Sequence, residues 1–352
     1  MTVEDENGQG KGQGVLYMGI DLGTSRTSVS ASNGVRETME SFVGYPKDPV
    51  ARKLLKRDVL FGEDARQHRL SLNLYRPLEH GVLKFNKEDG TDDENLRAAR
   101  DLIREIIRLS KPRKDELVYA VIGAPAQASI NNKDAILQAA RETVDSVMLC
   151  SEPFSVAYGL DMLDDVLVID IGAGTVDLCR MHGTMPEESD QITRTTAGDY
   201  VDAELSKLIK ESYPEAQFSV QMLKQIKERH STVDETTSSI HVSLPVQGKP
   251  REFDLTREIK AACRSIIPPI VEGLGQLVAT FDPEFQDKLK NRVLLAGGGS
   301  QIKGLDVAIQ AEMHKMLGGG TVIRVEEPVY GGANGALKIA HDMPAEYWEQ
   351  LK

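Results

Sequence analysis

Two stretches decide how this chain folds: Val15-Leu-Tyr-Met-Gly-Ile-Asp21-Leu-Gly23-Thr24-Ser25 and Val166-Leu-Val-Ile-Asp170-Ile-Gly172-Ala-Gly174-Thr175-Val-Asp177. Each begins as an apolar run that ends in Asp, continues with an aliphatic residue and a turn rich in Gly, Thr or Ser, and leads into a second β-type run. This pattern is typical of a β-hairpin whose turn presents backbone N–H groups, hydroxyls and one carboxylate. Two such hairpins that face each other would hold a polyphosphate together with its Mg²⁺.

The composition is that of a folded protein with more than one core. The chain has 352 residues, of which 40% are apolar and 27% charged, so it is long enough for two domains. The formal net charge of -12 argues against a nucleic-acid-binding protein, which would normally present a basic face. A phosphate ligand would therefore depend on local backbone dipoles, Mg²⁺ and a few Lys or Arg side chains.

The cysteines and the N-terminal segment indicate in which compartment the protein resides. Cys150, Cys179 and Cys263 are widely spaced, without a CxxC pair or a Cys/His cluster, so the sequence predicts neither a disulfide framework nor a zinc site. No apolar run is long enough to span a bilayer. Residues 1–14 are polar and glycine-rich, without the pattern of a signal peptide or an amphipathic anchor, and we expect disorder there. These features favour a reducing cytoplasm and no direct membrane insertion.

Strands alternate with helices throughout the chain. The pattern predicts helix Glu94–Ser110, strand Leu117–Ile122, helix 130–142, strand Ser146–Cys150, a helix opening at Ser151, helices 199–212 and 220–230, a β-type stretch Ser239–Phe253, a helix from Arg257 to Phe281, strand Arg292–Ala296 and helix 301–317. The pair Pro268-Pro269 should bend or split the helix that contains it. This order predicts two α/β domains with mixed sheets, related by duplication, and a ligand cleft between them.

The two hairpin turns carry the residue types that a polyphosphate needs. In the first turn Gly23, Thr24 and Ser25 can direct N–H and hydroxyl donors at phosphate oxygens, whereas Asp21, itself an anion, is suited to hold Mg²⁺ through water. An ordinary tight turn with Asp and Gly as turn formers is the alternative. The second turn repeats the design with four residues, and this repetition favours the phosphate site: Asp170, Gly172, Gly174 and Thr175.

A third glycine cluster, Gly297-Gly298-Gly299-Ser300, lies between a predicted strand and a predicted helix. Bare backbone at this point would pack flat against a purine or a ribose. A tight strand-to-helix turn also needs glycine, so this cluster alone is weak evidence. Its spacing fits neither the dinucleotide-binding fingerprint nor the Walker A loop.

These elements, in this order, resemble the actin and Hsp70-type ATPase superfamily. The resemblance runs from Gly19 to Gly335 and includes two connector segments, Glu152–Gly159 and Gly331–Ala336. It implies an α/β actin-like fold, with two duplicated RNase H-like α/β domains and an interdomain nucleotide cleft. The expected boundaries are a disordered tail at 1–14, domain I at 15–160 with an accessory lobe at about 41–80, domain II at 161–328 with a lobe at about 199–256, and a segment 329–352 that returns to domain I.

The resemblance also assigns roles to single residues. Glu152 would position and polarise the attacking water with help from Thr175, since phosphoryl transfer depends mainly on positioning and charge stabilisation. The alternative for Glu152 is an acid favoured by a helix N-terminus. Asp21 and Asp170 would hold Mg²⁺ through water.

A second group of residues would lie beside the nucleoside. Lys227 and Glu228 resemble an actin-type pair beside the adenine and ribose, although such a pair is also common on a solvated helix face. Gly198-Asp199, with Asp202, resembles the ribose-side turn of bacterial actins, and an ordinary helix N-cap at Asp199 is the competing interpretation.

Several branches of the superfamily fit less well. An Hsp70-type chaperone would carry a further domain after about residue 340, and a sugar kinase would need its own catalytic Asp. Cell-shape bacterial actins share the segment Arg76–Val82 but bind membranes through an amphipathic helix or an apolar loop. Closer resemblance is to magnetosome-associated bacterial actins, in Phe42–Asp48, Ser151–Phe154 and Pro344–Trp348.

The expected function follows from that resemblance. It implies an ATPase that uses ATP and Mg²⁺ and assembles with itself into cytoplasmic filaments that organise magnetosomes, with magnetosome-associated proteins as further partners. The rivals are a non-polymerising ATP-driven switch or chaperone-like regulator, a metabolite kinase and a cell-shape actin. Loop 44–58 is basic on an acidic protein and would suit either a subunit contact or solvent.

Overall fold

Two five-stranded sheets with the same strand order form the centre of the molecule. The computed structural model describes residues 14–84 and 94–351. The first sheet contains, in order, β10 (Ser146–Ser151), β9 (Glu116–Ala124), β1 (Gly14–Leu22), β2 (Arg26–Ala31) and β3 (Arg36–Glu40). The second contains β17 (Val322–Arg324), β16 (Val293–Ala296), β11 (Val166–Ile171), β12 (Val176–Met181) and β13 (Gln191–Arg194). We call each sheet with its helices the first half and the second half.

The two predicted hairpins occupy the same place in both sheets. β1 pairs antiparallel with β2 and parallel with β9, just as β11 pairs antiparallel with β12 and parallel with β16. Asp21 and Asp170 stand near the ends of their strands, opposite Ser28 and Asp177. The repeated design in the sequence is therefore a repeated topology, and the chain has the predicted duplicated α/β architecture.

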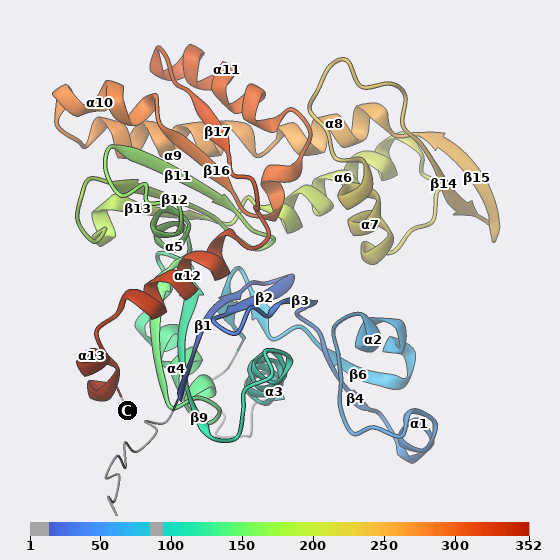
Figure 1. The fold of residues 1–352 in the computed structure, drawn as a ribbon. Coiled ribbons are helices and arrows are strands. Elements are labelled where there is room, and N and C mark those ends of the chain that lie inside the picture. The colour runs from blue at the N-terminus through green and yellow to red at the C-terminus, as the bar shows by residue number, and fades with distance from the viewer. Residues whose placement is uncertain (1–13, 85–93, 352) are drawn as a thin grey trace, which may run out of the picture.

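Helices and sheets alternate in layers (Figure 1). The outer layer of the first half is α3 (Glu94–Leu109) and α4 (Ile130–Arg141). α5 (Glu152–Gly159), α12 (Gly331–Asp342) and α13 (Ala345–Gln350) pack in one apolar cluster with strands of both sheets. The outer layer of the second half is α6 (Gly198–Ser212), α8 (Thr256–Arg264), α9 (Ile267–Ala279) and α11 (Leu305–Leu317).

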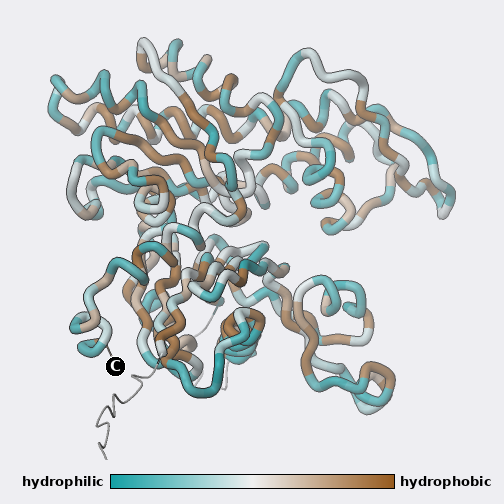
Figure 2. The backbone as a smooth tube through the Cα atoms, in the orientation of Figure 1, coloured by the Kyte–Doolittle hydropathy of each residue, from teal (hydrophilic) through white to brown (hydrophobic). Residues whose placement is uncertain are grey.

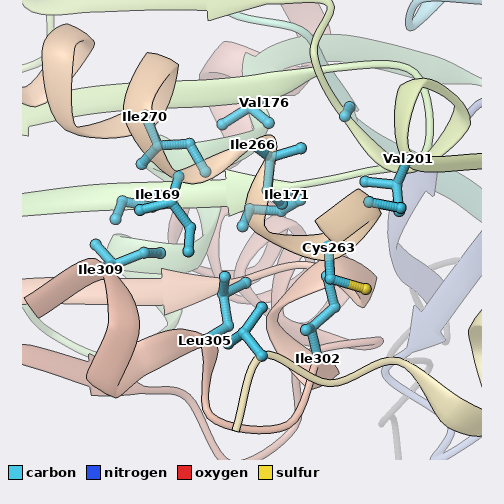
Figure 3. Packing of buried hydrophobic residues seen from close by; sticks show 14 of the residues in the cluster. Ile169, Ile171, Val176, Val201, Cys263, Ile266, Ile270, Ile302, Leu305 and Ile309 are labelled. Atoms are coloured by element: carbon cyan, nitrogen blue, oxygen red, sulfur yellow. The ribbon is translucent and has the colours of Figure 1, made fainter. Parts of the chain in front are cut away.

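Side-chain alternation along the buried strands supports these layers. In β11, Val166 and Val168 contribute to the central cluster, whereas Leu167 and Ile169 point to the outer helices of the second half. Figure 3 shows Ile169 packed with Ile270 and Ile309 in that outer core. Apolar residues accordingly follow the sheets and their covering helices in Figure 2.

Each half carries a small lobe. The first lobe is a three-stranded sheet with two short helices: β4 (Val43–Pro46), α1 (Pro49–Leu55), β5 (Leu60–Phe61), α2 (Gly62–Gln67), the 3₁₀ turn Arg69–Ser71 and β6 (Leu72–Tyr75). A short hairpin follows it, β7 (Leu78–Glu79) and β8 (Val82–Leu83). The second lobe contains α7 (Val220–His230) and the hairpin of β14 (His241–Val246) and β15 (Lys249–Asp254). The domain boundaries drawn from the sequence stay predictions.

Local departures from the predicted elements have simple causes. The disordered tail was expected at 1–14, but Gly14 is the first residue of β1. The other residues of the expected tail, 1–13, lie outside the described residues. The helix predicted from Arg257 to Phe281 is split into α8 and α9, with both prolines in the first turn of α9, where proline is tolerated. The sequence patterns did not predict α10 (Pro283–Lys290), the 3₁₀ turns Glu188–Asp190 and Gly298–Gln301, or the edge strands β3, β13 and β17. Within 14–84 and 94–351 no helix could cross a membrane.

Helices α5 and α12 cross backbone to backbone. A Cβ atom on Gly335 would lie 1.7 Å from the carbonyl oxygen of Ser155, and one on Gly19 would lie 2.1 Å from that of Ala333. After this crossing the chain ends on the first half, where the buried Trp348 ring stacks on Tyr119 with centroids 5.0 Å apart. Glycine is therefore required for the contact that joins the two halves.

We expect Gly335→Ala to destabilise the protein by about 3 kcal/mol, because the new methyl group must push α5 and α12 apart. Gly331→Ala on the same helix is the matched control, since its Cβ would lie 3.7 Å from Val156, an ordinary contact. Urea unfolding of both variants measures the difference. Equal stability of the two variants would contradict the packing argument.

Candidate functional site

A pocket of about 450 Å³ lies between the two halves. Its walls include both hairpin turns, the start of α5, the turn after β16 and one face of α7. The predicted site residues that line it are Asp21, Gly23, Thr24, Ser25, Glu152, Asp170, Gly172, Gly174, Thr175, Gly198, Lys227, Glu228, Gly297, Gly298 and Gly299. Asp202 is the one predicted residue that does not line the pocket. A pocket of this size suits a nucleotide-sized ligand.

The two hairpin turns face each other across this pocket. A Cβ atom on Gly174 would lie 2.5 Å from the Thr24 hydroxyl oxygen and 2.8 Å from the Cα of His80, so only glycine allows this approach. The turn between β7 and β8 contacts both hairpin turns. The backbone N–H of Gly81 donates to Thr24 Oγ1 at 2.8 Å, and His80 Nδ1 lies 3.1 Å from the carbonyl oxygen of Gly174. No sequence motif predicted a role for this turn in the site.

Three carboxyl groups, those of Asp21, Glu152 and Asp170, line the base of the pocket, and the buried Asp177 lies close enough to act on two of them. Burial raises the pKa of Asp21 to about 6, and it raises the pKa of Glu152 well above its usual value, with further contributions from the charges of Asp21, Asp177 and Asp170. The pKa of Asp170 is also raised well above its usual value, by burial and then by Asp21 and Asp177. Like charges in a desolvated site repel one another. The arrangement therefore favours a ligand that brings positive charge.

Asp177 belongs to this group but is held by the protein. Its Oδ1 accepts hydrogen bonds from the Thr193 hydroxyl at 2.5 Å and from the backbone N–H of Ala126 at 3.1 Å, while burial raises its pKa. Its Oδ2 is buried and has no hydrogen-bond partner among the residues that the structure describes. No described group of three or more His, Cys, Asp or Glu is arranged to hold a metal ion directly.

Among the residues predicted to lie beside the nucleoside, Lys227 and Asp202 form a pair within the second half, whereas Asp199 contacts the first half. Lys227 lines the pocket, but its ammonium lies 2.9 Å from Asp202 Oδ1 and donates to the carbonyl oxygen of Gly198 at 2.7 Å. Asp202 is buried and therefore reaches the site only through Lys227. Asp199 is not a helix cap, because the N-cap position of α6 is Ala197. Its carboxylate instead pairs with Arg76 of the first half at 2.8 Å.

The glycines after β16 serve two purposes. Gly297 has a φ of +76°, and a Cβ atom added there would lie 2.3 Å from Asp170 Oδ1. A Cβ atom on Gly299 would lie 2.3 Å from the Ile171 side chain. Both are therefore needed where this turn packs on the end of β11. Gly298 has no atom within 4 Å of its Cβ position, so it leaves open space in the pocket wall.

Further residues at the site, which no sequence motif predicted, come from both halves. Lys224 and Arg26 line the pocket, and Arg76 donates from its Nε to the carbonyl oxygen of Thr24 at 2.8 Å. Lys224 could have been found, because it precedes Lys227 by one helical turn. No sequence signal relates Arg76 to Asp199, since their contact depends on the tertiary fold.

The sequence and the structure both resemble known bacterial actins. The chain matches the family described as MreB/Mbl protein over residues 16–346. It is 39% identical over 344 residues to the actin-like protein MamK of Paramagnetospirillum magneticum, a match that covers 98% of this chain and 97% of that protein. A structure of the MamK double helical filament has a TM-score of 0.89 at 38% identity, covering 94% of this chain and 100% of that one.

A second MamK structure matches less closely in shape. It is a non-polymerising mutant bound to AMPPNP, with a TM-score of 0.71 at the same 38% identity and the same coverage of 94% and 100%. Identity and coverage are equal for the two structures, so their TM-scores differ because of shape alone. The conformation described for this chain is closer to that of the filament.

The raised pKa of Asp21 predicts a stability effect. In the unfolded chain this carboxyl ionises near 3.8, but in the folded protein only near 6, so its ionisation lowers stability as the pH rises between these values. We expect ligand-free Asp21→Asn to melt at least about 2 °C higher than the natural protein at pH 7, with the difference vanishing near pH 4. Asp115→Asn, whose side chain is 85% exposed, is the control. A lower melting temperature for Asp21→Asn at pH 7 would contradict the assignment.

Proposed function

The chain belongs to the MreB/Mbl family of actin-like proteins, and we propose that it is a magnesium-dependent ATPase that assembles into cytoplasmic filaments. The observation that carries this proposal is the pocket between the halves, whose two matched turns offer backbone N–H groups and hydroxyls to one ligand. A polyphosphate is the ligand that this donor set suits best. The AMPPNP bound by the MamK variant supports the choice of an adenine nucleotide.

In this proposal the nucleotide spans the pocket from its base to α7. Gly23, Thr24 and Ser25 bind phosphate oxygens from the first half, and Gly172, Gly174 and Thr175 bind them from the second. The nucleoside lies toward the open wall at Gly298 and the pocket face of α7, where Gly198, Lys227 and Glu228 stand. Asp202 contributes by holding Lys227.

The carboxyl groups at the base fit a hydrated Mg²⁺. Asp21 and Asp170 would hold it through water, with Asp177 behind them. Its charge would offset the cost of burying these carboxylates, which raises the pKa of Asp21 and of Asp170, and the repulsion that adds to the shift of Asp170. When bound, the ion neutralises charge on the phosphates.

We assign the positioning of the attacking water to Glu152, with help from Thr175. Glu152 is the first residue of α5, is 9% exposed and lines the pocket beside the carboxyl groups of the base. A carboxylate at this point can orient a water molecule for attack on the terminal phosphate. The alternative, an acid that merely stabilises the helix N-terminus, would not require it to face the pocket.

Self-assembly is the second part of the proposal. It is supported by the similarity to the MamK double helical filament and by the closer match to that conformation. Organisation of magnetosomes, and partners among magnetosome-associated proteins, are proposed on the resemblance to MamK. The rival function is an ATP-driven switch of the same fold that never polymerises.

Sedimentation separates the two functions. With Mg²⁺ and ATP, we expect a large share of the protein to pellet above a critical concentration, and electron microscopy of the pellet to show filaments. The same protein without nucleotide, and with ATP plus a chelator, provides the controls. Protein that stays in the supernatant well above micromolar concentration, in several salts, would favour the switch; ATP use that depends on an added sugar or acid would favour a kinase.

Glu152→Gln tests the catalytic assignment. We expect phosphate release to fall by about 10²-fold or more while ATP still binds, because the variant keeps the shape of the side chain but cannot act as a base. Filaments should then form and persist. Glu228→Gln, which removes a carboxylate from the opposite wall, should alter ATP affinity more than the rate of the chemical step. Normal phosphate release by Glu152→Gln would refute the assignment.

A further inference from the structure

One face of α7 borders the pocket from the second half. Three of its residues, Lys224, Lys227 and Glu228, line the pocket together with its C-cap residue Ser231. Their spacing of three, four and seven positions places them on one stripe of the helix. Lys224 lies nearest to the first half, because its ammonium contacts the hydroxyl of Ser25 in the first hairpin turn.

Two of the three charged residues on this stripe form ion pairs with charged residues of the protein. Lys227 has Asp202 at 2.9 Å, and Glu228 has Arg26 at 3.6 Å. Lys224 is half-buried, yet among the described residues no carboxylate oxygen lies within ion-pair distance of it. Burial lowers its pKa, and the charge of Glu228, one turn further along the helix, opposes this effect. A partly desolvated ammonium with only a neutral hydroxyl as partner is an unusual and costly arrangement.

The neighbouring cations already have partners. Arg76 pairs with Asp199 at 2.8 Å, and Arg26 pairs with Glu228. Their positive charges also act against the ammonium of Lys224 and contribute to lowering its pKa. Of the cations that border the pocket in the described chain, Lys224 is thus the one whose charge is available to a ligand.

We propose that Lys224 is a nucleotide-binding residue that contacts the phosphate chain at the Ser25 end of the first hairpin turn. This inference rests on the proposed function and adds a residue to it. A phosphate oxygen is a stronger acceptor for an ammonium than a serine hydroxyl is, so the ligand supplies the missing anion. Because Lys224 belongs to α7 and Ser25 to the first half, the ligand also draws the two halves together at this side of the pocket.

Four variants test this role: Lys224→Ala, Lys224→Gln, Lys224→Arg and Arg229→Ala. Arg229 is the matched control, because it removes one positive charge from an exposed position on the same helix. Binding of ATP and ADP, with Mg²⁺, is measured by calorimetry, and adenosine is measured as a millimolar competitor. We expect Lys224→Ala and Lys224→Gln to bind ATP and ADP about 10-fold or more weakly, because a charged hydrogen bond is lost. Adenosine binding should not change, Lys224→Arg should keep most of the affinity, and Arg229→Ala should match the natural protein.

The outcomes separate this inference from the function on which it rests. If the natural protein does not bind ATP, the proposed function fails; if it does and Lys224→Ala binds ATP equally well, only the role of Lys224 fails. Equal losses for ATP and adenosine would also overturn it, since the effect would not depend on phosphate. Thermal unfolding without nucleotide tests a purely structural contact with Ser25: we expect Lys224→Gln to melt no lower than the natural protein, and a clearly lower melting temperature would count against the proposal.

Discussion

The two halves of this molecule meet where two helices touch through their backbones. Gly335 leaves no side chain between α12 and the carbonyl oxygen of Ser155 in α5, and Gly19 leaves none between β1 and α12. The position of α5 in the site depends on this approach. It sets α5, and with it Glu152, beside the ends of both central hairpins. A single methyl group at the crossing would move those ends apart.

The charges around the pocket are arranged in two zones. Carboxyl groups gather at its base, where burial raises their pKa values, while cations and acids from opposite halves pair along its side, as Arg76 does with Asp199. A ligand that carries both a metal cation and phosphate anions matches both zones. The pocket is thus electrostatically incomplete by itself, because the base needs positive charge and Lys224 needs an anion.

The sequence predicted those parts of the site that depend on local pattern. The hairpins around Asp21 and Asp170 could be predicted, because a strand that ends in Asp before a glycine turn is visible along the chain. Lys224 could have been found from its helical spacing to Lys227, but Arg76 and His80 could not, because their roles arise from contacts between the halves. The α10 helix, Pro283–Lys290, was missed because it is short and largely polar. The N-cap alternative for Asp199 was wrong, because α6 begins at Gly198 and its N-cap is Ala197.

The return of the chain to its first half has a consequence for synthesis on the ribosome. The outer core of the second half uses residues between Leu167 and Met313, so it is complete once that stretch has emerged. The first sheet is made earlier, but its inner face stays uncovered until α12 and Trp348 arrive near the end of the chain. The inner face of the first sheet is therefore covered last, and until then its exposed apolar strands need protection from aggregation.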